Sequence, residues 1–401
     1  MPQRMRRVSI LLFFLAMLGI NGCTGDTGGA INTAEKPEGG YLPTQDSYYG
    51  VAVVDQDDAW VVGQRGVVLH LTEGGRNVEA QETGLRNAWY SASFVDAQDG
   101  LISGEFGTIM RTRDGGKTWQ RLSVDIPVPK EEVLVMGVDP TQDNVEMREA
   151  ALPHIFSLAR AETNPLSIWG VGERGTIVYS GNGGESWENL SLGHDVMLNG
   201  VYFVSETEGW IVGEFGTIIH TSDGGRTWED QTEVLGLPKY LEPGVSDEEA
   251  YLASIPELHL EDLYFYDVGF NTPLEGYVVG LSGFLLQTSD GGKTWHYTHG
   301  DTYDHLFKIA LANQQKGVVS GAVGTILTGG SEKKWKPLED VQEHVYTWLR
   351  DVDFAPDGVF GVASGGNGTI LITEDAGSKW GAVPRETLQM AGVRARTQPE
   401  S

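Results

Sequence analysis

Residues 200–231 read GVYFVSETEGWIVGEFGTIIHTSDGGRTWEDQ, and this stretch contains the unit from which most of the chain is built. Short runs of β-branched and aromatic residues alternate with Gly, Asp, Ser and Thr, a pattern typical of strands joined by tight turns. Helical periodicity is absent from the stretch. It therefore predicts four antiparallel strands, at 201–204, 209–213, 217–221 and 227–231.

The Gly-x-x-Gly element of this stretch recurs seven times, and an aliphatic residue stands two positions after each second glycine. Successive first glycines are separated by 41, 68, 41, 67, 41 and 44 residues. Repeats of about 40–45 residues with four short strands each indicate a β-propeller. We predict an all-β fold: a single seven-bladed β-propeller with four-stranded antiparallel blades. How the ring closes does not follow from the repeats; pairing of blade one with blade seven is the simplest arrangement. The first glycines are Gly63, Gly104, Gly172, Gly213, Gly280, Gly321 and Gly365.

A second motif follows each of these turns and is best preserved at 222–228 (SDGGRTW) and 289–295 (SDGGKTW). This hairpin is an Asp-box, in which the carboxylate can accept hydrogen bonds from amides of its own turn and the tryptophan packs between blades. One copy falls on the outer hairpin of each blade, so we interpret the motif as structural rather than catalytic. Its residues are Asp114, Asn182, Asp223, Asp290 and Asp375, with Trp119, Trp187, Trp228, Trp295, Trp335 and Trp380.

The Gly-x-x-Gly turns are expected to share one face of the ring with the blade-to-blade crossovers, because connections in a meander alternate between two faces. Two insertions of about 26 residues fall on the same face, near 124–153 and 233–258. The second is predicted to hold a short helix around 247–253. Long loops on a rigid scaffold are usually functional, so this face is the predicted binding surface for a partner. Its candidate residues are Arg65, Glu105, Phe106, Glu173, Arg174, Glu214 and Phe215.

The N-terminus has the features of an export signal. Basic residues precede an apolar run at 8–20, and Cys23, the only cysteine of the chain, follows Gly22. Residues 1–22 therefore resemble a lipoprotein signal peptide with Cys23 as the lipidation site; an ordinary secretory signal is the alternative. We expect an exported, lipid-anchored protein, located at the outer membrane facing the periplasm or at the cell surface.

The rest of the chain divides simply. Residues 23–44 are rich in Gly, Thr and charged residues and predict a flexible tether. The propeller is expected to occupy 45–385, and 386–401 to form a C-terminal tail that is free after Pro384.

Composition and missing motifs exclude several functions. A formal net charge of −28 opposes binding to nucleic acid and to anionic lipid headgroups. The chain has no Gly-x-Ser-x-Gly elbow, phosphate loop or dinucleotide fingerprint, so we expect no enzyme activity and no cofactor. His296, His299 and His305 have a spacing that fits no standard metal site, and we interpret them as solvent-exposed. We predict no metal centre.

The Asp-boxes TSDGGRTW and TSDGGKTW and the turns GEFGTI and GERGTI resemble those of the photosystem II stability/assembly factor family, a branch of the BNR/Asp-box propellers. The resemblance covers 45–385. It implies a non-enzymatic, monomeric propeller, exported or lumenal, that binds immature membrane-protein subunits and helps them assemble. Photosynthetic members of the family use a basic patch; here Arg65 and Arg174 occupy two of the turns, whereas Glu105 and Glu214 occupy others.

Two alternatives remain open at this level. One is an accessory lipoprotein of a membrane transporter or exporter. The other is a glycan-binding or glycoside hydrolase-like propeller, because sialidases and glycan hydrolases share the Asp-box. Trp89, Tyr90, Tyr346 and Trp348 are candidates for a sugar site near the axis, with core packing as the competing interpretation.

Overall fold

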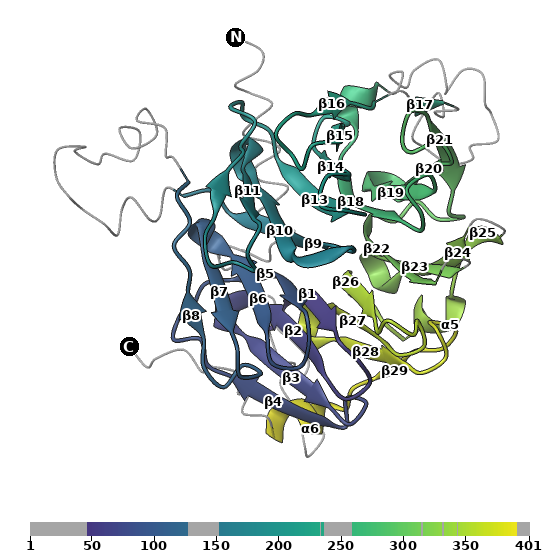
Figure 1. The fold of residues 1–401 in the computed structure, drawn as a ribbon. Coiled ribbons are helices and arrows are strands. Elements are labelled where there is room, and N and C mark those ends of the chain that lie inside the picture. The colour runs from purple at the N-terminus through teal and green to yellow at the C-terminus, as the bar shows by residue number, and fades with distance from the viewer. Residues whose placement is uncertain are drawn as a thin grey trace, which may run out of the picture.

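The computed structural model describes residues 46–126, 152–232, 234–235, 259–313, 316–330, 333–342 and 344–390. Seven small antiparallel sheets, the blades, surround a common axis, as Figure 1 shows. The signal segment, Cys23, the tether, most of both insertions with the expected helix at 247–253, and the end of the tail lie outside the described residues. No helix in the described part is long and apolar enough to cross a membrane.

The blades follow one another along the chain, and each is a meander of consecutive strands. Blade 1 contains β1 (Tyr48–Val53), β2 (Ala59–Gly63), β3 (Val68–Thr72) and β4 (Asn77–Gln81). Blade 2 contains β5 (Trp89–Phe94), β6 (Gly100–Gly104), β7 (Ile109–Thr112) and β8 (Gln120–Arg121). Blade 3 contains β9 (Ile155–Ala161), β10 (Asn164–Gly172), β11 (Ile177–Ser180) and β12 (Glu188–Asn189). Blade 4 contains β13 (Leu198–Phe203), β14 (Gly209–Gly213), β15 (Ile218–Thr221) and β16 (Glu229–Asp230).

The remaining blades repeat the same order. Blade 5 contains β18 (Phe265–Phe270), β19 (Gly276–Gly280), β20 (Phe284–Thr288) and β21 (Trp295–His299). Blade 6 contains β22 (Leu306–Asn313), β23 (Lys316–Gly321), β24 (Ile326–Gly330) and β25 (Lys333–Pro337). Blade 7 contains β26 (Leu349–Phe354), β27 (Gly361–Gly365), β28 (Ile370–Thr373) and β29 (Gly381–Ala382). The predicted seven-bladed all-β propeller is confirmed.

One blade departs from the four-stranded pattern. The second insertion begins with β17 (Val234–Leu235), which pairs in parallel with β21 and makes blade 5 a five-stranded sheet. Because the fourth strand of a blade is an exposed edge with unpaired backbone groups, it can accept another strand from a neighbouring segment.

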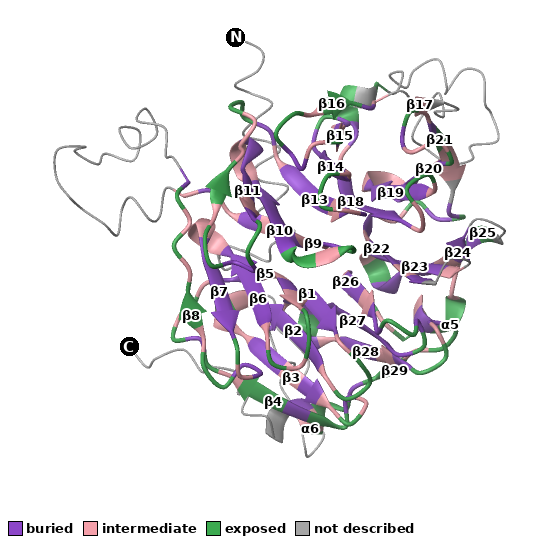
Figure 2. Cartoon of the chain, in the orientation of Figure 1, coloured by how far each residue is buried: buried purple, intermediate pink, exposed green. Residues whose placement is uncertain are grey.

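Burial decreases from the inner strands outward, as Figure 2 shows. The second strands are buried along their whole length in most blades, as in β2 and β14. The outermost strands β8, β12, β16 and β29 have two residues each, all exposed. Each blade therefore buries both faces against its neighbours, and the core is a ring of interfaces between blades rather than one central cluster.

Three of these interfaces contain the same aromatic arrangement. A tryptophan from the second strand of one blade stacks on a phenylalanine from the first strand of the next, and the Asp-box tryptophan of that next blade meets the phenylalanine edge-on. Trp169 and Phe203 have ring centroids 3.5 Å apart, with Trp228 at 6.3 Å and nearly perpendicular to Phe203. The other two sets are Trp60, Phe94 and Trp119, and Trp210, Phe270 and Trp295.

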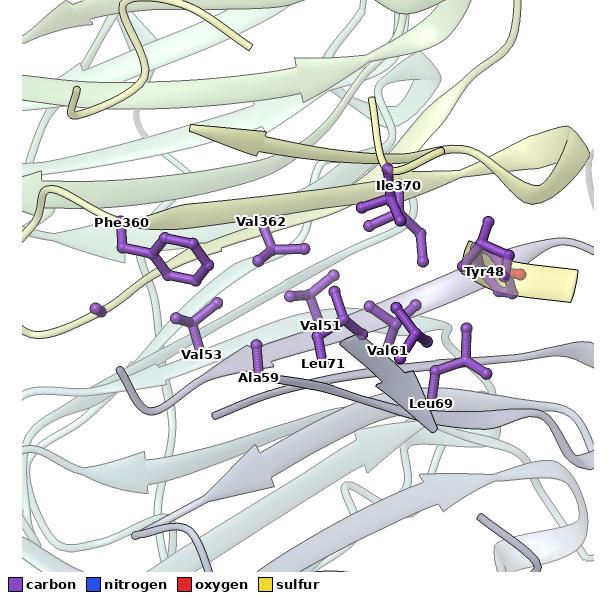
Figure 3. Packing of buried hydrophobic residues seen from close by; sticks show 14 residues of the cluster. Tyr48, Val51, Val53, Ala59, Val61, Leu69, Leu71, Phe360, Val362 and Ile370 are labelled. Atoms are coloured by element: carbon purple, nitrogen blue, oxygen red, sulfur yellow. The ribbon is translucent and has the colours of Figure 1, made fainter. Parts of the chain in front are cut away.

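Blade 1 packs against blade 7 and so closes the ring. Tyr48 and Val51 of blade 1 pack with Val362 and Ile370 of blade 7 in one buried cluster, shown in Figure 3. Polar contacts hold the same junction: the carboxylate of Asp351 accepts a hydrogen bond from the Val51 amide at 2.8 Å. No strand is exchanged between the two blades, because each of them is continuous in sequence.

The start of the tail is not free, which corrects the expectation for residues just after Pro384. Helix α6 (Arg385–Met390) follows blade 7, and Leu388 is 1% exposed within the cluster that joins blades 1 and 7. This contact depends on how an apolar side chain packs at the junction of two blades. The sequence of a six-residue segment does not indicate such packing.

Candidate binding face

The Gly-x-x-Gly turns lie on the same face as the crossovers that lead into each first strand; we call it the turn face. In all seven blades the amide of the first residue between the glycines donates to a carbonyl just before the first strand of the same blade. For example, the Glu105 amide donates to the Ala88 carbonyl at 3.0 Å. Gly107 lies near Ile126 and Leu152, which flank the first insertion, so this insertion begins and ends at the turn face.

The three glutamates predicted for this face point into the structure. Their carboxylates accept hydrogen bonds from backbone amides of the crossovers: Ala88 to Glu105 at 2.9 Å, His154 to Glu173 at 3.0 Å and Met197 to Glu214 at 2.8 Å. Glu214 is only 8% exposed. These side chains hold the turns against the strands, which leaves little of their charge for a partner.

The second residue of each turn is exposed in blades 1, 4, 6 and 7 and half-buried in the other three. All seven have left-handed backbone angles, with φ between 52° and 60°, which are costly for any residue other than glycine and most costly for a β-branched one such as Val323. Phe215 is 50% and Val323 is 55% exposed. Backbone strain of this kind persists where the surrounding fold imposes it and is common at functional sites. The seven residues are Arg65, Phe106, Arg174, Phe215, Ser282, Val323 and Asn367.

The neighbours of these residues differ from blade to blade. Arg65 forms an ion pair with Asp46, with Nη2 and Oδ1 3.2 Å apart. The amides of Phe106 and Ser282 donate to the Nδ1 atoms of His154 and His305, each at 3.0 Å. Burial lowers the pKa of His305 despite the nearby Asp304. The expectation that His305 is solvent-exposed is therefore wrong: its ring is half-buried and accepts a hydrogen bond from the turn.

A ring of side chains lies closer to the axis, at the same end of the first strands. The register of every first strand shifts at one residue, a β-bulge that redirects a side chain. These residues contact one another between consecutive blades: Tyr49 and Tyr90 have centroids 5.7 Å apart, and Tyr266 and Phe307 5.3 Å. We call this set the axial ring: Tyr49, Tyr90, Phe156, Asn199, Tyr266, Phe307 and Arg350.

Sequence reasoning found only one member of the axial ring, Tyr90. A signal was present, since the members stand 14 residues before the first turn glycine in five blades, 15 in blade 7 and 16 in blade 3. Of the other candidates near the axis, Trp348 stacks on Tyr49 at 5.8 Å and Tyr346 is 81% exposed. Trp89 is fully buried, which agrees with the interpretation as core.

Charged residues lie beneath the axial ring. Lys308 follows Phe307, and its Nζ lies 3.3 Å from Oδ1 of the buried Asp267. Burial would lower the pKa of Lys308, but Asp267, Asp351 and Asp353 raise it above its usual range, so the lysine is a cation. Burial in turn raises the pKa of Asp351 to about 7, although Lys308 and the Val51 amide oppose the shift.

The Asp-boxes lie on the opposite face, in the turns between third and fourth strands. In blade 4, Oδ1 of Asp223 accepts from the Thr227 amide at 2.9 Å and Oδ2 from the Thr227 hydroxyl at 2.6 Å. These hydrogen bonds lower the pKa of Asp223 to about 2. Asp114, Asp290 and Asn182 make equivalent contacts within their own turns. A carboxylate fixed in this way is a poor proton donor at neutral pH.

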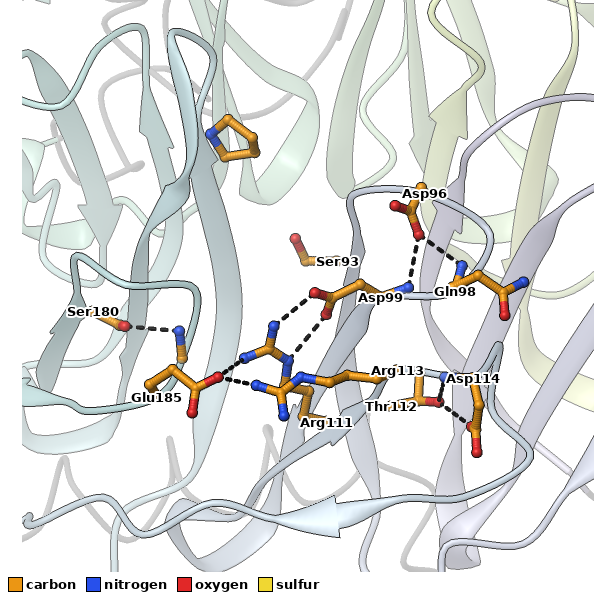
Figure 4. Close-up of polar contacts among 12 residues, drawn as sticks. Ser93, Asp96, Gln98, Asp99, Arg111, Thr112, Arg113, Asp114, Ser180 and Glu185 are labelled. Carbon is orange, nitrogen blue, oxygen red and sulfur yellow. Dashed lines mark hydrogen bonds and ion pairs between the residues drawn. The ribbon is translucent and has the colours of Figure 1, made fainter.

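Ion pairs join two blades on the Asp-box face, shown in Figure 4. Arg111 binds both carboxylate oxygens of Asp99 within blade 2, at 2.6 and 3.0 Å, and reaches Glu185 in the Asp-box turn of blade 3 at 3.1 Å. Arg113 also contacts Glu185. No group of three or more His, Cys, Asp or Glu side chains in the described ranges is placed to hold a metal ion.

These observations define a seven-bladed Asp-box propeller whose two faces differ: one carries internally bonded Asp-boxes, the other strained turns and an aromatic axial ring. Residues 32–154, 156–242 and 246–338 match the family described as photosynthesis system II assembly factor YCF48. This chain belongs to that family, which confirms the resemblance noted from its motifs.

Individual relatives are distant. The photosystem II assembly lipoprotein Ycf48 of Synechocystis sp. is 36% identical over 77 residues, which are 19% of this chain and 21% of that protein. Among solved structures, one described as YCF48 bound to D1 peptide has a TM-score of 0.57 at 17% identity, over 83% of this chain and 93% of that one. The structure of the GH74 enzyme of Niastella koreensis has a TM-score of 0.57 at 12% identity, over 85% of this chain and 54% of that enzyme. Likeness at such identities shows a shared fold alone.

Proposed function

We propose that this protein is a non-enzymatic, lipid-anchored scaffold that binds a subunit of a membrane protein complex at its turn face and assists the assembly or stability of that complex. Family membership supports the general role. The choice of the turn face as the binding surface rests on its seven left-handed turn residues. Several of them present Arg, Phe or Val side chains to solvent at a cost in backbone strain.

The turn face has the features of a protein-binding surface. Aromatic residues and arginine are enriched at interface centres, where they provide a large contact area with few rotatable bonds. Phe215 and Arg65 meet this description, with Tyr303 and Tyr346 exposed on crossovers of the same face. The glutamates that would oppose an apolar partner are turned inward by backbone hydrogen bonds.

Site-specific photocrosslinking in the native host tests this proposal. A benzophenone amino acid replaces Phe215 on the turn face or, as a matched control, Leu274, which is 58% exposed in a turn on the opposite face. We expect a membrane-protein adduct from position 215 and none from 274. Adducts in equal yield from both positions, or none from 215, would contradict the choice of face.

The identity of the adduct separates the remaining alternatives. A photosystem subunit supports a role like that named for the Synechocystis relative, whereas a transporter or exporter subunit assigns the accessory-lipoprotein role. Thermal stabilisation of the purified protein by oligosaccharides, in the absence of a protein adduct, would favour the glycan-binding alternative.

The lipid anchor is a separate part of the proposal and rests on Cys23 after an apolar segment. Metabolic labelling with a clickable palmitate analogue is expected to mark the wild type and not Cys23→Ala. Labelling of both would refute Cys23 as the anchor. Fractionation of inner from outer membranes then tests the outer-membrane location.

A further inference from the structure

Arg350 is the only charged member of the axial ring, and it lies over aromatic faces contributed by the two preceding blades. Its guanidinium carbon is 5.5 Å from the centroid of the Tyr266 ring and 5.4 Å from that of Phe307. Two cation–π contacts hold the group in place and leave its N–H donors available, because an aromatic face accepts no conventional hydrogen bond.

The surroundings of Arg350 lack the acid that usually accompanies arginine. Among the described residues, no carboxylate oxygen comes within the 4.0 Å of an ion pair with its guanidinium, although the whole chain has a net charge of −28. Arg65 and Arg111, by contrast, both have carboxylate partners. Arg350 is partly exposed, so its five donors face a position that another molecule can reach.

The rest of the ring determines what kind of ligand fits. Tyr49 is buried, but it stacks on Trp348 and contacts Tyr90, and these two rings are half-buried, so they provide the accessible aromatic surface beside Arg350. The next residues along the first strands carry Asp267, Asp351 and one lysine already paired with Asp267. Because Lys308 is already paired with Asp267, it does not attract an anion that passes below Arg350. The surface therefore suits a shallow contact with one acidic group that has apolar neighbours.

We propose that the axial ring is a recognition site for an aspartate or glutamate side chain on an exposed partner loop, with the carboxylate bound by Arg350 and adjacent apolar side chains packed on the half-buried rings of Tyr90 and Trp348. Tyr266 and Phe307 are buried beneath Arg350 and hold its guanidinium in place. This inference rests on the proposed function and adds the chemistry of the partner segment. A planar guanidinium binds a carboxylate through two parallel hydrogen bonds, which gives the site both charge and directional selectivity.

Binding of three synthetic peptides to the full-length lipoprotein in detergent tests the proposal. The first, acetyl-Ala-Leu-Asp-Phe-Ala-amide, carries a side-chain carboxylate; the second has Asn in place of Asp; the third has Asn and a free C-terminal carboxylate. One charge-assisted hydrogen-bond pair predicts that the Asp peptide binds about tenfold more tightly than the Asn peptide. Equal affinity of these two, or tightest binding by the free-terminus peptide, overturns the proposal.

Variants of the arginine connect the preference to this side chain. R350Q is expected to remove the tenfold preference, and R350K, which keeps the charge without the planar fork, to retain part of it. R76Q serves as the control: Arg76 is an exposed arginine in the turn between β3 and β4, on the opposite face, and its loss should leave the preference unchanged. A preference that survives in R350Q, with an unaltered melting temperature, refutes the assignment.

The same variants distinguish this inference from the proposed function. If the crosslinker at position 215 captures the partner equally well in the R350Q background, the turn face is a binding surface but the axial ring is not part of it. If position 215 captures nothing in the wild type, the proposed function itself fails, whatever the peptides do.

Discussion

Replacing Asp351 with asparagine tests how the ring is closed beneath the axial ring. The carboxylate lies at the junction of blades 7 and 1, where it accepts the Val51 amide at 2.8 Å, and the residue is 9% exposed. Lys308 from blade 6, Asp267 from blade 5 and Asp353 from its own strand are the other charged groups around it. Asparagine keeps an oxygen acceptor for the Val51 amide and removes the titrating charge.

The size and sign of the effect follow from the pKa. Burial raises the pKa of Asp351 from 3.8 to about 7. Asp351 therefore keeps its proton to higher pH in the folded state than in the unfolded state. Its contribution to the free energy of unfolding is fully present below pH 3.8 and is lost as the pH rises through 7. Each pKa unit corresponds to about 1.4 kcal/mol, so the total loss is on the order of 4 kcal/mol.

Because the D351N variant lacks this titration, we expect its free energy of unfolding, relative to the wild type, to rise by about 3 kcal/mol between pH 4.5 and pH 8. Denaturant unfolding followed by tryptophan fluorescence at four or more pH values measures this difference. Titrating groups far from Asp351, such as Asp223, are present in both proteins and cancel. Glu79→Gln, at an exposed position on β4, is the control and should give a flat difference. A flat difference for D351N as well would refute the description of Asp351 as a buried, proton-retaining carboxylate.

Three further substitutions test separate parts of the fold by denaturant unfolding or thermal melting. Phe203→Ala removes a fully buried ring stacked on Trp169 and should lower the free energy of unfolding by about 3–5 kcal/mol; a change below about 1 kcal/mol would contradict the stacked interface. Val323→Gly relieves a β-branched residue at φ 52° and should stabilise the protein by about 1 kcal/mol, whereas a loss of stability would argue against strain in the turn. Leu388→Ala should cost about 2–4 kcal/mol if α6 is docked, and unchanged stability would mean that it is not.

Local chemistry made much of this architecture predictable. The turn from Gly63 to Gly66 takes extended and left-handed backbone angles within four residues, and the Asp223 hairpin contains its own hydrogen-bond partners. These local turn conformations and hydrogen bonds repeat from blade to blade and involve only residues that are close in the sequence. The number of blades and the strand order therefore followed from the repeat, and the turn face followed from the alternation of the connections in a meander.

The parts that the sequence did not reveal depend on contacts between distant segments. Val51 and Asp351 are 300 residues apart, yet their hydrogen bond joins the first blade to the last. Glu214 looked like an exposed acid until the structure placed its carboxylate on the Met197 amide, and Leu388 looked like part of a free tail until α6 packed at the junction.

The repeat alone determined the propeller, because a short motif with fixed turn chemistry specifies one blade and seven copies specify the ring. The tertiary structure decided which side chains face a partner. Only the packing of blades 5, 6 and 7 against one another brings Tyr266, Phe307 and Arg350 together, and the direction of each of these side chains is set by a bulge and by neighbours from other repeats.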